Sequence, residues 1–329
     1  MIAPADKVVL PVVRPSPGRS GESLRTVLTA ISANILIAVA KGVAALLTGS
    51  AALWAETLHS IADSGNEVLL LVGLSRSKKQ VDPQHPFGYG QERYFWSFLA
   101  ALGIFLVGGV LSIAEGVRGL LDPDPLTSPL IGIGVLLVAA FFEGLSWMVS
   151  RRQLRDGARQ TGRSLRQHLQ WSSDLSAPTV FLEDSAALIG IAVALSALIL
   201  HLVTGNPVWD AAASICIGVL LLVVAVLLAG RSKALLIDES APADIVAPIR
   251  QTIIGHPWVT NVTRLDVTFT GPIRLLVLAR IEVAEDLWNG SARDLHQNVH
   301  QLRQDLLRSE AIAEVSISID GDQPGPGDH

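Results

Sequence analysis

Five polar side chains lie on one apolar stretch in the first quarter of the chain. They are Glu56, His59, Asp63, Asn66 and Glu67. On a helix all five fall within an arc of about 100°, so one face carries the polarity of the stretch. Because an ionisable group inside a membrane helix is costly, such groups mark ion pathways and transport sites. The pattern therefore indicates a cation-binding or transport site inside a membrane.

His59 and Asp63 are one helical turn apart, so an imidazole nitrogen and a carboxylate oxygen can point at one ion. In a soluble helix such a pair more often forms a simple hydrogen bond, but inside a bilayer that bond alone leaves carboxylate lone pairs unsatisfied. Asp184, Glu183 and Glu143 lie at compatible depths in two later apolar runs. We expect His59, Asp63 and Asp184 to bind a metal ion, with Glu143 or Glu183 as the fourth ligand. Helix packing is the alternative role for Glu143.

The ligand types indicate which metal the site would take. One nitrogen and three oxygens suit Zn²⁺, and Mn²⁺, Fe²⁺ and Co²⁺ remain compatible. The single Cys216 excludes a Cys-rich zinc site and a disulfide framework within the chain.

Lys41 is the single basic residue deep in the first apolar run. One interpretation is that its side chain reaches toward the outer interface of the membrane. The other is that Lys41 is a counter-charge to Glu56 when the metal site is empty, which would give both residues a part in charge and proton coupling.

Membrane helices are needed to position these residues. Half of the 329 residues are hydrophobic and the mean hydropathy is +0.44, which is too apolar for an ordinary soluble domain. A helix of ~20 apolar residues crosses the hydrocarbon core. We expect six crossings, at about 26–48, 51–74, 94–117, 129–149, 178–203 and 208–230.

Charge and the chain ends suggest a topology. Basic residues gather in alternate connections, which by the positive-inside rule predicts that both termini are cytoplasmic. Residues 1–24 lack the apolar core of a signal peptide and predict a disordered cytoplasmic tail. From the missing targeting segment we expect a bacterial inner (plasma) membrane. The net charge of −5 gives no reason to expect nucleic acid as a partner.

A change of pattern near Leu235 marks a second domain. Ala243–Ile254 predicts a helix, alternating apolar residues over 265–283 predict a hairpin, and residues 295–306 and 315–319 predict a helix and a third strand. The expected order is αββαβ, an α+β cytoplasmic domain over residues 235–320, followed by a disordered tail at 321–329. A domain this small gains by burying surface against a second copy, which favours a homodimer.

Two motifs in these elements resemble those of the cation diffusion facilitator family. The first is Gly49-Ser50 followed by His59-Ser60-Ile61-Ala62-Asp63, and the second is His85-Pro86-Phe87-Gly88-Tyr89-Gly90. The resemblance covers about residues 25–320. It implies an all-α, six-helix transmembrane cation efflux domain over 25–232 and a ferredoxin-like cytoplasmic domain. Arg93-Tyr94, Phe142-Glu143-Gly144 and Leu182–Ala187 are similar to the branch typified by the mitochondrial zinc transporter.

The resemblance also implies a transport site of two residues on the second crossing and two on the fifth. His59, Asp63 and Asp184 match three of these positions, but Val180 stands at the fourth and cannot bind metal. This departure is the reason for considering Glu143 and Glu183, and it leaves metal selectivity open.

Some family members hold a second ion at the loop after the second crossing. Asp82 and His85 stand at the matching positions, while Tyr89 replaces a His. A two-ligand remnant would bind weakly, and the alternative is a turn that shapes the loop. The strands of the C-terminal domain carry Arg264, Arg280 and Ile317 where relatives have ligands, so we expect no metal site there.

These observations predict a transporter that exports a divalent metal, foremost Zn²⁺, from the cytoplasm in exchange for protons by alternating access. Metal demands deprotonated oxygens and neutral imidazole, so metal and protons compete for one site. The expected partners are the lipid bilayer and a second copy of the chain, with no tightly bound cofactor. The alternatives are an Mn²⁺ or Fe²⁺ exporter, import in place of export, a transport-inactive regulatory homologue and a membrane-embedded metal-dependent enzyme.

Overall fold

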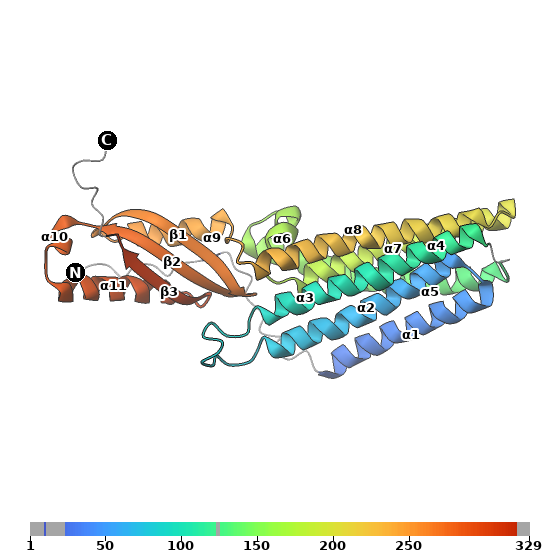
Figure 1. Cartoon of the computed structure of the whole chain (residues 1–329), viewed down its shortest axis with the longest axis horizontal. Helices are drawn as coiled ribbons and strands as arrows, with labels where there is room; N and C mark the ends of the chain where they lie inside the picture. The colour runs from blue at the N-terminus through green and yellow to red at the C-terminus, as the bar shows by residue number, and fades with distance from the viewer. Residues whose placement is uncertain (1–9, 11–23, 123–125, 321–329) are drawn as a thin grey trace.

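The computed structural model describes Leu10, residues 24–122 and residues 126–320, without the side chains of residues 24–30 and 33. A long helical bundle and a smaller α+β domain lie end to end (Figure 1). The bundle helices are α1 (Leu24–Thr48), α2 (Ala51–Arg76), α3 (Glu92–Gly103), η1 (Ile104–Val110), α4 (Leu111–Leu121), α5 (Pro129–Thr161), α7 (Ser176–Thr204) and α8 (Val208–Leu236). We call the end of the bundle that meets the smaller domain the domain side.

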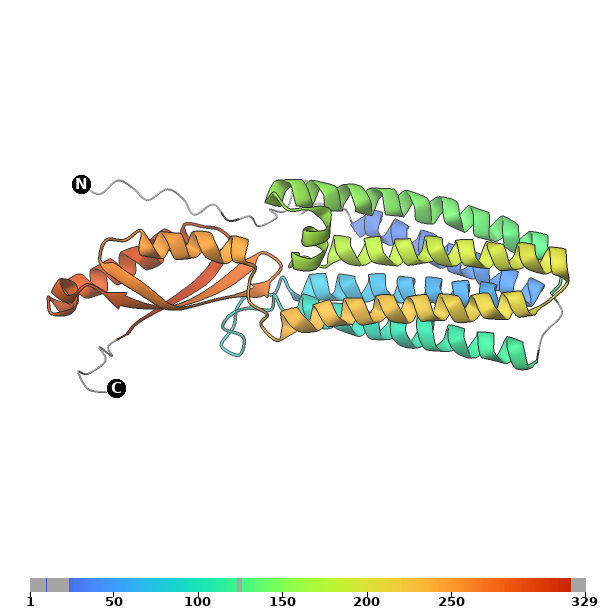
Figure 2. The ribbon, with the colours of Figure 1, turned by 90° about the horizontal axis from the view of Figure 1, so that it is seen from above.

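Four helical stretches of the described chain are long and apolar enough to cross a membrane. They are Glu92–Leu121, which joins α3, η1 and α4, then Pro129–Thr161, Ser176–Thr204 and Val208–Leu236. Helix α2, with its polar face, does not meet the same test, and the described apolar part of α1 is the shorter segment Asn34–Thr48. Both helices nevertheless pack within the bundle, α1 against α2 and α5 (Figures 1 and 2). The six crossings therefore remain a prediction.

Small residues allow close packing of the third apolar stretch against α8. A Cβ added at Gly109 would lie 2.4 Å from Leu222 Cδ2, and one at Gly218 would lie 2.9 Å from the Gly109 carbonyl oxygen. Close approach of helix backbones at small residues is the usual way in which helices associate inside a membrane. The same segment contains the π-helix η1.

Helix α5 extends well beyond the predicted end of its apolar run. The apolar sequence stops near Val149, but the helix continues to Thr161 and ends at Gly162 in the left-handed conformation, with φ 66°. Hydropathy marks the end of the apolar run, not the end of the helix. The helix continues in water because arginine and glutamine are good helix formers. The short helix α6 (Leu165–Trp171) follows, and Ser164 and Gln167 form a capping box at its start.

The C-terminal domain contains α9 (Ala243–Ile254), β1 (Val259–Gly271), β2 (Arg274–Val283), α10 (Glu285–Trp288), α11 (Ala292–Leu307) and β3 (Ile312–Ile319). Strand β1 pairs antiparallel with β2, and β2 pairs parallel with β3. One face of the sheet and the apolar sides of α9 and α11 form the core, which includes Ile249, Val277 and Leu302.

The predicted helices and strands of this domain are present, with the additional short helix α10 between β2 and α11. The ferredoxin-like description is not established. That fold has the order βαββαβ, whereas the described residues form a three-stranded sheet in the order β1-β2-β3. The tails predicted as disordered, 1–24 and 321–329, lie almost entirely outside the described residues.

Three connections of the bundle touch the C-terminal domain at the domain side (Figure 2). Arg163, between α5 and α6, donates to both carboxylate oxygens of Asp244 at 2.6 and 2.8 Å. Ser173 donates to the carbonyl oxygen of Pro272 at 2.5 Å. In the loop before α3, a Cβ at Gly90 would lie 2.2 Å from the Thr270 carbonyl oxygen, so only glycine allows this approach.

Candidate functional site

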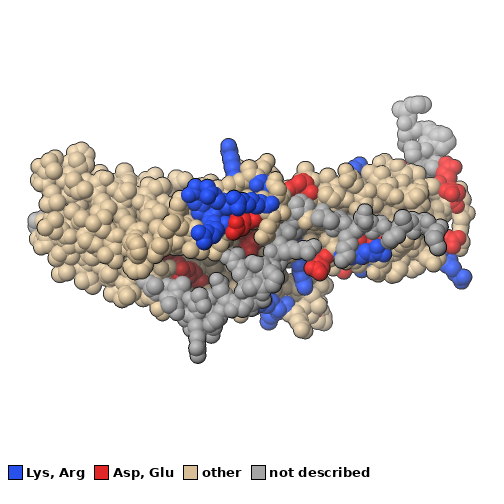
Figure 3. Space-filling model, turned by 180° about the vertical axis from the view of Figure 1, so that it is seen from behind, with Lys and Arg blue, Asp and Glu red and all other residues tan. Residues whose placement is uncertain are grey.

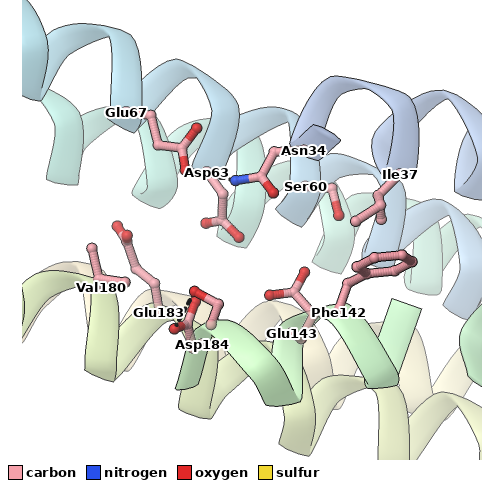
Figure 4. Close-up of a pocket in the computed structure, with 11 residues that line it drawn as sticks. Asn34, Ile37, Ser60, Asp63, Glu67, Phe142, Glu143, Val180, Glu183 and Asp184 are labelled. Carbon is pink, nitrogen blue, oxygen red and sulfur yellow. Dashed lines mark hydrogen bonds between the residues drawn. The ribbon is translucent and has the colours of Figure 1, made fainter. Parts of the chain in front are cut away.

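A cavity of about 50 Å³ lies between α1, α2, α5 and α7. Five carboxylates among the described residues line it, from three helices far apart in the sequence: Asp63, Glu67, Glu143, Glu183 and Asp184. Figure 4 shows Asp63 and Glu67 on one side of the gap and the other three acidic side chains on the opposite side. So much negative charge within an apolar bundle requires cations or protons to balance it.

His59 and Asp63 lie on α2 as the sequence spacing predicts. His59 Nε2 is 3.4 Å from Asp63 Oδ2, but neither ring nitrogen of His59 nor Asp63 Oδ1 has a hydrogen-bond partner among the described residues. His59 is 1% exposed and does not line the cavity itself. One lone-pair nitrogen of the neutral ring and one carboxylate oxygen are therefore buried without a partner among the described residues.

Glu183 is held to α2 by a side-chain amide. Asn66 Nδ2 donates to both carboxylate oxygens of Glu183, at 2.6 and 2.7 Å. Asn66 Oδ1 has no partner among the described residues. This contact joins α2 and α7 beside the cavity.

Asp184 and Glu143 approach the cavity from the opposite side. Asp184 Oδ2 accepts hydrogen bonds from the hydroxyls of Ser146 at 2.9 Å and Ser150 at 3.4 Å. Glu143, one turn before Ser146 on α5, points into the gap (Figure 4). Glu143 therefore lines the cavity, and its role as a metal ligand stays a prediction.

Asn34 of α1 was missed by the sequence analysis. Its Nδ2 donates to Glu67 Oε1 at 2.6 Å, and both residues line the cavity. Asn34 and Lys41 are seven residues apart, two turns along one helix face, so a polar stripe on the first apolar run could have indicated Asn34. The contacts of Ser146 and Ser150 with Asp184 could not be predicted from the sequence in the same way, because serine is common in membrane helices.

Lys41 forms a fully buried ion pair with Glu56. Lys41 Nζ lies 2.9 Å from Glu56 Oε2, both side chains are 0% exposed, and the same ammonium donates to Ser60 Oγ at 2.9 Å. The side chain therefore does not extend to the membrane interface. A Cβ added at Gly190 of α7 would lie 2.3 Å from Glu56 Oε1, so the α7 backbone closes over the pair.

Val180 also lines the cavity, at the fourth position of the site that the family resemblance implies. As they stand, no three His, Cys, Asp or Glu side chains in the described part of the chain are grouped closely enough to hold a metal ion. Binding one ion by several of these residues thus requires the helices or side chains to move together.

Asp82 and His85 lie in the loop between α2 and α3. Asp82 Oδ1 accepts from the backbone N–H of His85 at 2.8 Å and lies 3.2 Å from its ring Nδ1, while Tyr89 donates to Oδ2 at 2.5 Å. The Tyr89 hydroxyl, foremost among these donors, lowers the pKa of Asp82 to about 2. Because both carboxylate oxygens are engaged within the loop, this geometry matches the turn-shaping alternative.

Comparison with known proteins matches the part of the chain that forms this cavity to a protein family. A family model described as the cation efflux transmembrane domain matches residues 27–237. The proton-coupled zinc antiporter SLC30A9, mitochondrial, of Homo sapiens is 34% identical over 247 residues, which are 75% of this chain and 44% of that protein. Metal tolerance protein C4 of Arabidopsis thaliana is 36% identical over 218 residues, 66% of this chain and 48% of that protein.

A bacterial relative is matched over most of its length. The cation-efflux pump FieF of Serratia proteamaculans is 28% identical over 311 residues, 94% of this chain and 95% of that protein. In contrast, the chain spans about half the length of the human and Arabidopsis relatives. The human relative, at higher identity, is a mitochondrial protein by name, and this finding overturns the expectation of a bacterial plasma membrane. That expectation rested on a missing targeting segment, which says little about location.

Proposed function

The chain belongs to the cation efflux, or cation diffusion facilitator, family, and on that premise we propose that it exchanges a divalent metal ion, foremost Zn²⁺, for protons. The family is one of transporters, so the alternative of a membrane-embedded enzyme is set aside. The observation that carries the proposal is the cavity in which carboxylates of α2, α5 and α7 converge. Zn²⁺ takes imidazole nitrogen and carboxylate oxygen as ligands.

We assign the metal ligands as His59, Asp63 and Asp184, with Glu183 or Glu143 as the fourth. His59 and Asp63 offer buried atoms without hydrogen-bond partners among the described residues. Glu183 lies next to Val180 within one turn of α7 and supplies the carboxylate that Val180 lacks. In this proposal, binding of the ion draws these groups of α2, α5 and α7 together around it.

Metal and protons exchange because they compete for the same atoms. In an apolar surrounding a carboxylate favours its protonated form, whereas a bound metal requires deprotonated oxygen and neutral imidazole. Metal arriving from the domain side displaces protons, and protons arriving from the far side displace the metal. Alternating access through six crossings then transports metal away from the domain side, and each net charge moved contributes ~2.3 kcal/mol per 100 mV of membrane potential.

Lys41 and Glu56 balance charge beside the site in this proposal. The ammonium neutralises one carboxylate and donates to Ser60, which lines the cavity. The ammonium therefore lies near the cavity wall, and Glu56 is the carboxylate whose charge it balances when no metal is bound. Assembly as a homodimer through the C-terminal domain is also part of the proposal.

Zinc-driven proton flux in proteoliposomes tests the assignment. Asp63→Ala and Asp184→Ala should each abolish the flux, because each removes a ligand that Zn²⁺ needs. Asp156→Ala is the matched control, because Asp156 is exposed and lies beyond the apolar part of α5. This variant should transport like the wild type. Transport retained in both cavity variants would overturn the proposal. The regulatory alternative, suggested by Val180, predicts no flux in the wild type either.

A further inference from the structure

We propose that Arg152, Arg155 and Arg159 bind the headgroups of anionic phospholipids on the domain side of the membrane. The three residues lie on the part of α5 that continues beyond the apolar run, and all three side chains are exposed. Figure 3 shows a concentrated patch of basic side chains where the bundle approaches the C-terminal domain. This proposal concerns a surface of the bundle, and it does not depend on the transport site.

The three arginines share one face of α5 with its lipid-facing side chains. At 100° per residue, they fall within about 60° of one another and in the same arc of about 80° as Phe141, Leu145 and Met148. Those apolar residues are 62%, 41% and 55% exposed, as expected of side chains in contact with lipid tails. The arginines therefore continue the stripe that faces the bilayer.

The depth of the arginines matches that of the headgroups. About 20 residues from Pro129 cross the hydrocarbon, to near Met148. Trp147 lies at this level with the guanidinium of Arg151 5.0 Å from its ring centre, and tryptophan is enriched at membrane interfaces. At 1.5 Å per residue, Arg152 and Arg155 lie about 6 and 10 Å beyond Met148, level with the headgroups. Arg159 lies about 16 Å beyond Met148, at the outer limit of the field of the charged surface.

The three arginine side chains of this face are available to bind an anionic partner. Arg152, Arg155 and Arg159 form no hydrogen bond or ion pair with any described residue. Asp156, the acidic neighbour on the helix, forms no ion pair with them, and Asp244 is occupied by Arg163. The N-terminal segment offers no acidic run to cover the patch, because residues 1–23 contain three basic and two acidic residues. Clusters of arginine next to a membrane helix attract anionic lipids in this way.

The test measures phospholipid retained by the full-length protein in detergent micelles containing equal amounts of phosphatidylglycerol and phosphatidylcholine. The wild type should retain phosphatidylglycerol preferentially. Replacing all three arginines by glutamine should weaken the binding of phosphatidylglycerol by about five-fold for each arginine. The charge-matched control is Arg274→Gln, Arg280→Gln and Arg293→Gln, three exposed arginines of the C-terminal domain, and it should bind as the wild type does.

A second variant separates charge from folding. Replacing Arg152, Arg155 and Arg159 by lysine keeps the charge and should keep most of the preference for phosphatidylglycerol, and high salt should weaken it. Equal retention of both phospholipids by the wild type would overturn the proposal and leave the arginines a role in topology alone. Loss of the preference in the lysine variant, or an equal loss in the control, would also overturn it.

Discussion

Asn66 donates its side-chain amide to both carboxylate oxygens of Glu183, at 2.6 and 2.7 Å, and so ties the helix that carries His59 and Asp63 to the helix that carries Asp184. In the proposed site, these are the carboxylate oxygens that Glu183 would offer to a metal ion, so the amide and the ion would compete for them.

Asn66→Ala should tighten zinc binding. Without the amide, Glu183 is free to become a metal ligand, and a hydrogen bond to a charged group is worth about 1.5–3 kcal/mol, which corresponds to roughly ten-fold or more in affinity. Competition with a zinc chelator measures this change. Asn34→Ala is the matched control, because it frees Glu67, which is not among the proposed ligands. Equal tightening in both variants would count against Glu183 as a ligand.

Val180→Asp should also tighten zinc binding, because it places a carboxylate in the cavity wall at the position that lacks one. Val180→Asn has the same shape without the charge and serves as its control. The affinity for Zn²⁺ should rise by about ten-fold or more in the Asp variant relative to the Asn variant. If the two variants bind zinc alike, position 180 does not face the bound ion.

Lys41→Met should destabilise the protein strongly. Removing one partner of a buried ion pair leaves an uncompensated charge and costs about 3–5 kcal/mol. The double variant Lys41→Met with Glu56→Gln removes both charges and should recover much of the loss. Thermal unfolding in detergent compares the two variants. A double variant no more stable than Lys41→Met would show that packing of the lysine side chain, not its charge, stabilises the bundle.

His168 should make stability depend on pH. Its ring packs against Gly157 at the domain side, and burial, assisted by Arg163, lowers its pKa from the ordinary 6.5. The folded protein thus favours neutral His168, so its contribution is complete above pH 6.5 and is lost as the pH falls below that value.

His168→Gln should therefore flatten the decline in melting temperature between about pH 7.5 and about pH 5.5, which bracket the ordinary histidine pKa. His296→Gln, at an exposed position on α11, is the control and should keep the wild-type decline. An unchanged slope in the His168 variant would mean that other groups control the acid sensitivity.

Periodicity predicted much of the fold, because apolar runs and alternating residues directly reflect burial. Helix α2, the hairpin of β1 and β2, and α11 lie close to their predicted positions. The extension of α5 was not predictable from hydropathy, since a helix can leave the membrane without ending. The ion pair between Lys41 and Glu56 was one of two predicted alternatives, because residue spacing within one helix does not determine which of its faces packs against the neighbouring helix.

The candidate site was predictable in part for the same reason. His59 and Asp63 follow from a spacing of one turn on a single helix. Asn34 and Ser146 became recognisable only through their contacts with Glu67 and Asp184, which depend on tertiary packing. The fourth ligand likewise depends on how α5 and α7 approach α2.

A structure determined with zinc bound tests the central claim most directly. The account predicts one ion in the cavity, about 2.0–2.2 Å from a ring nitrogen of His59 and from carboxylate oxygens of Asp63 and Asp184. The fourth ligand should come from Glu183 or Glu143. An ion bound elsewhere, with these side chains too far apart to share it, would contradict the account.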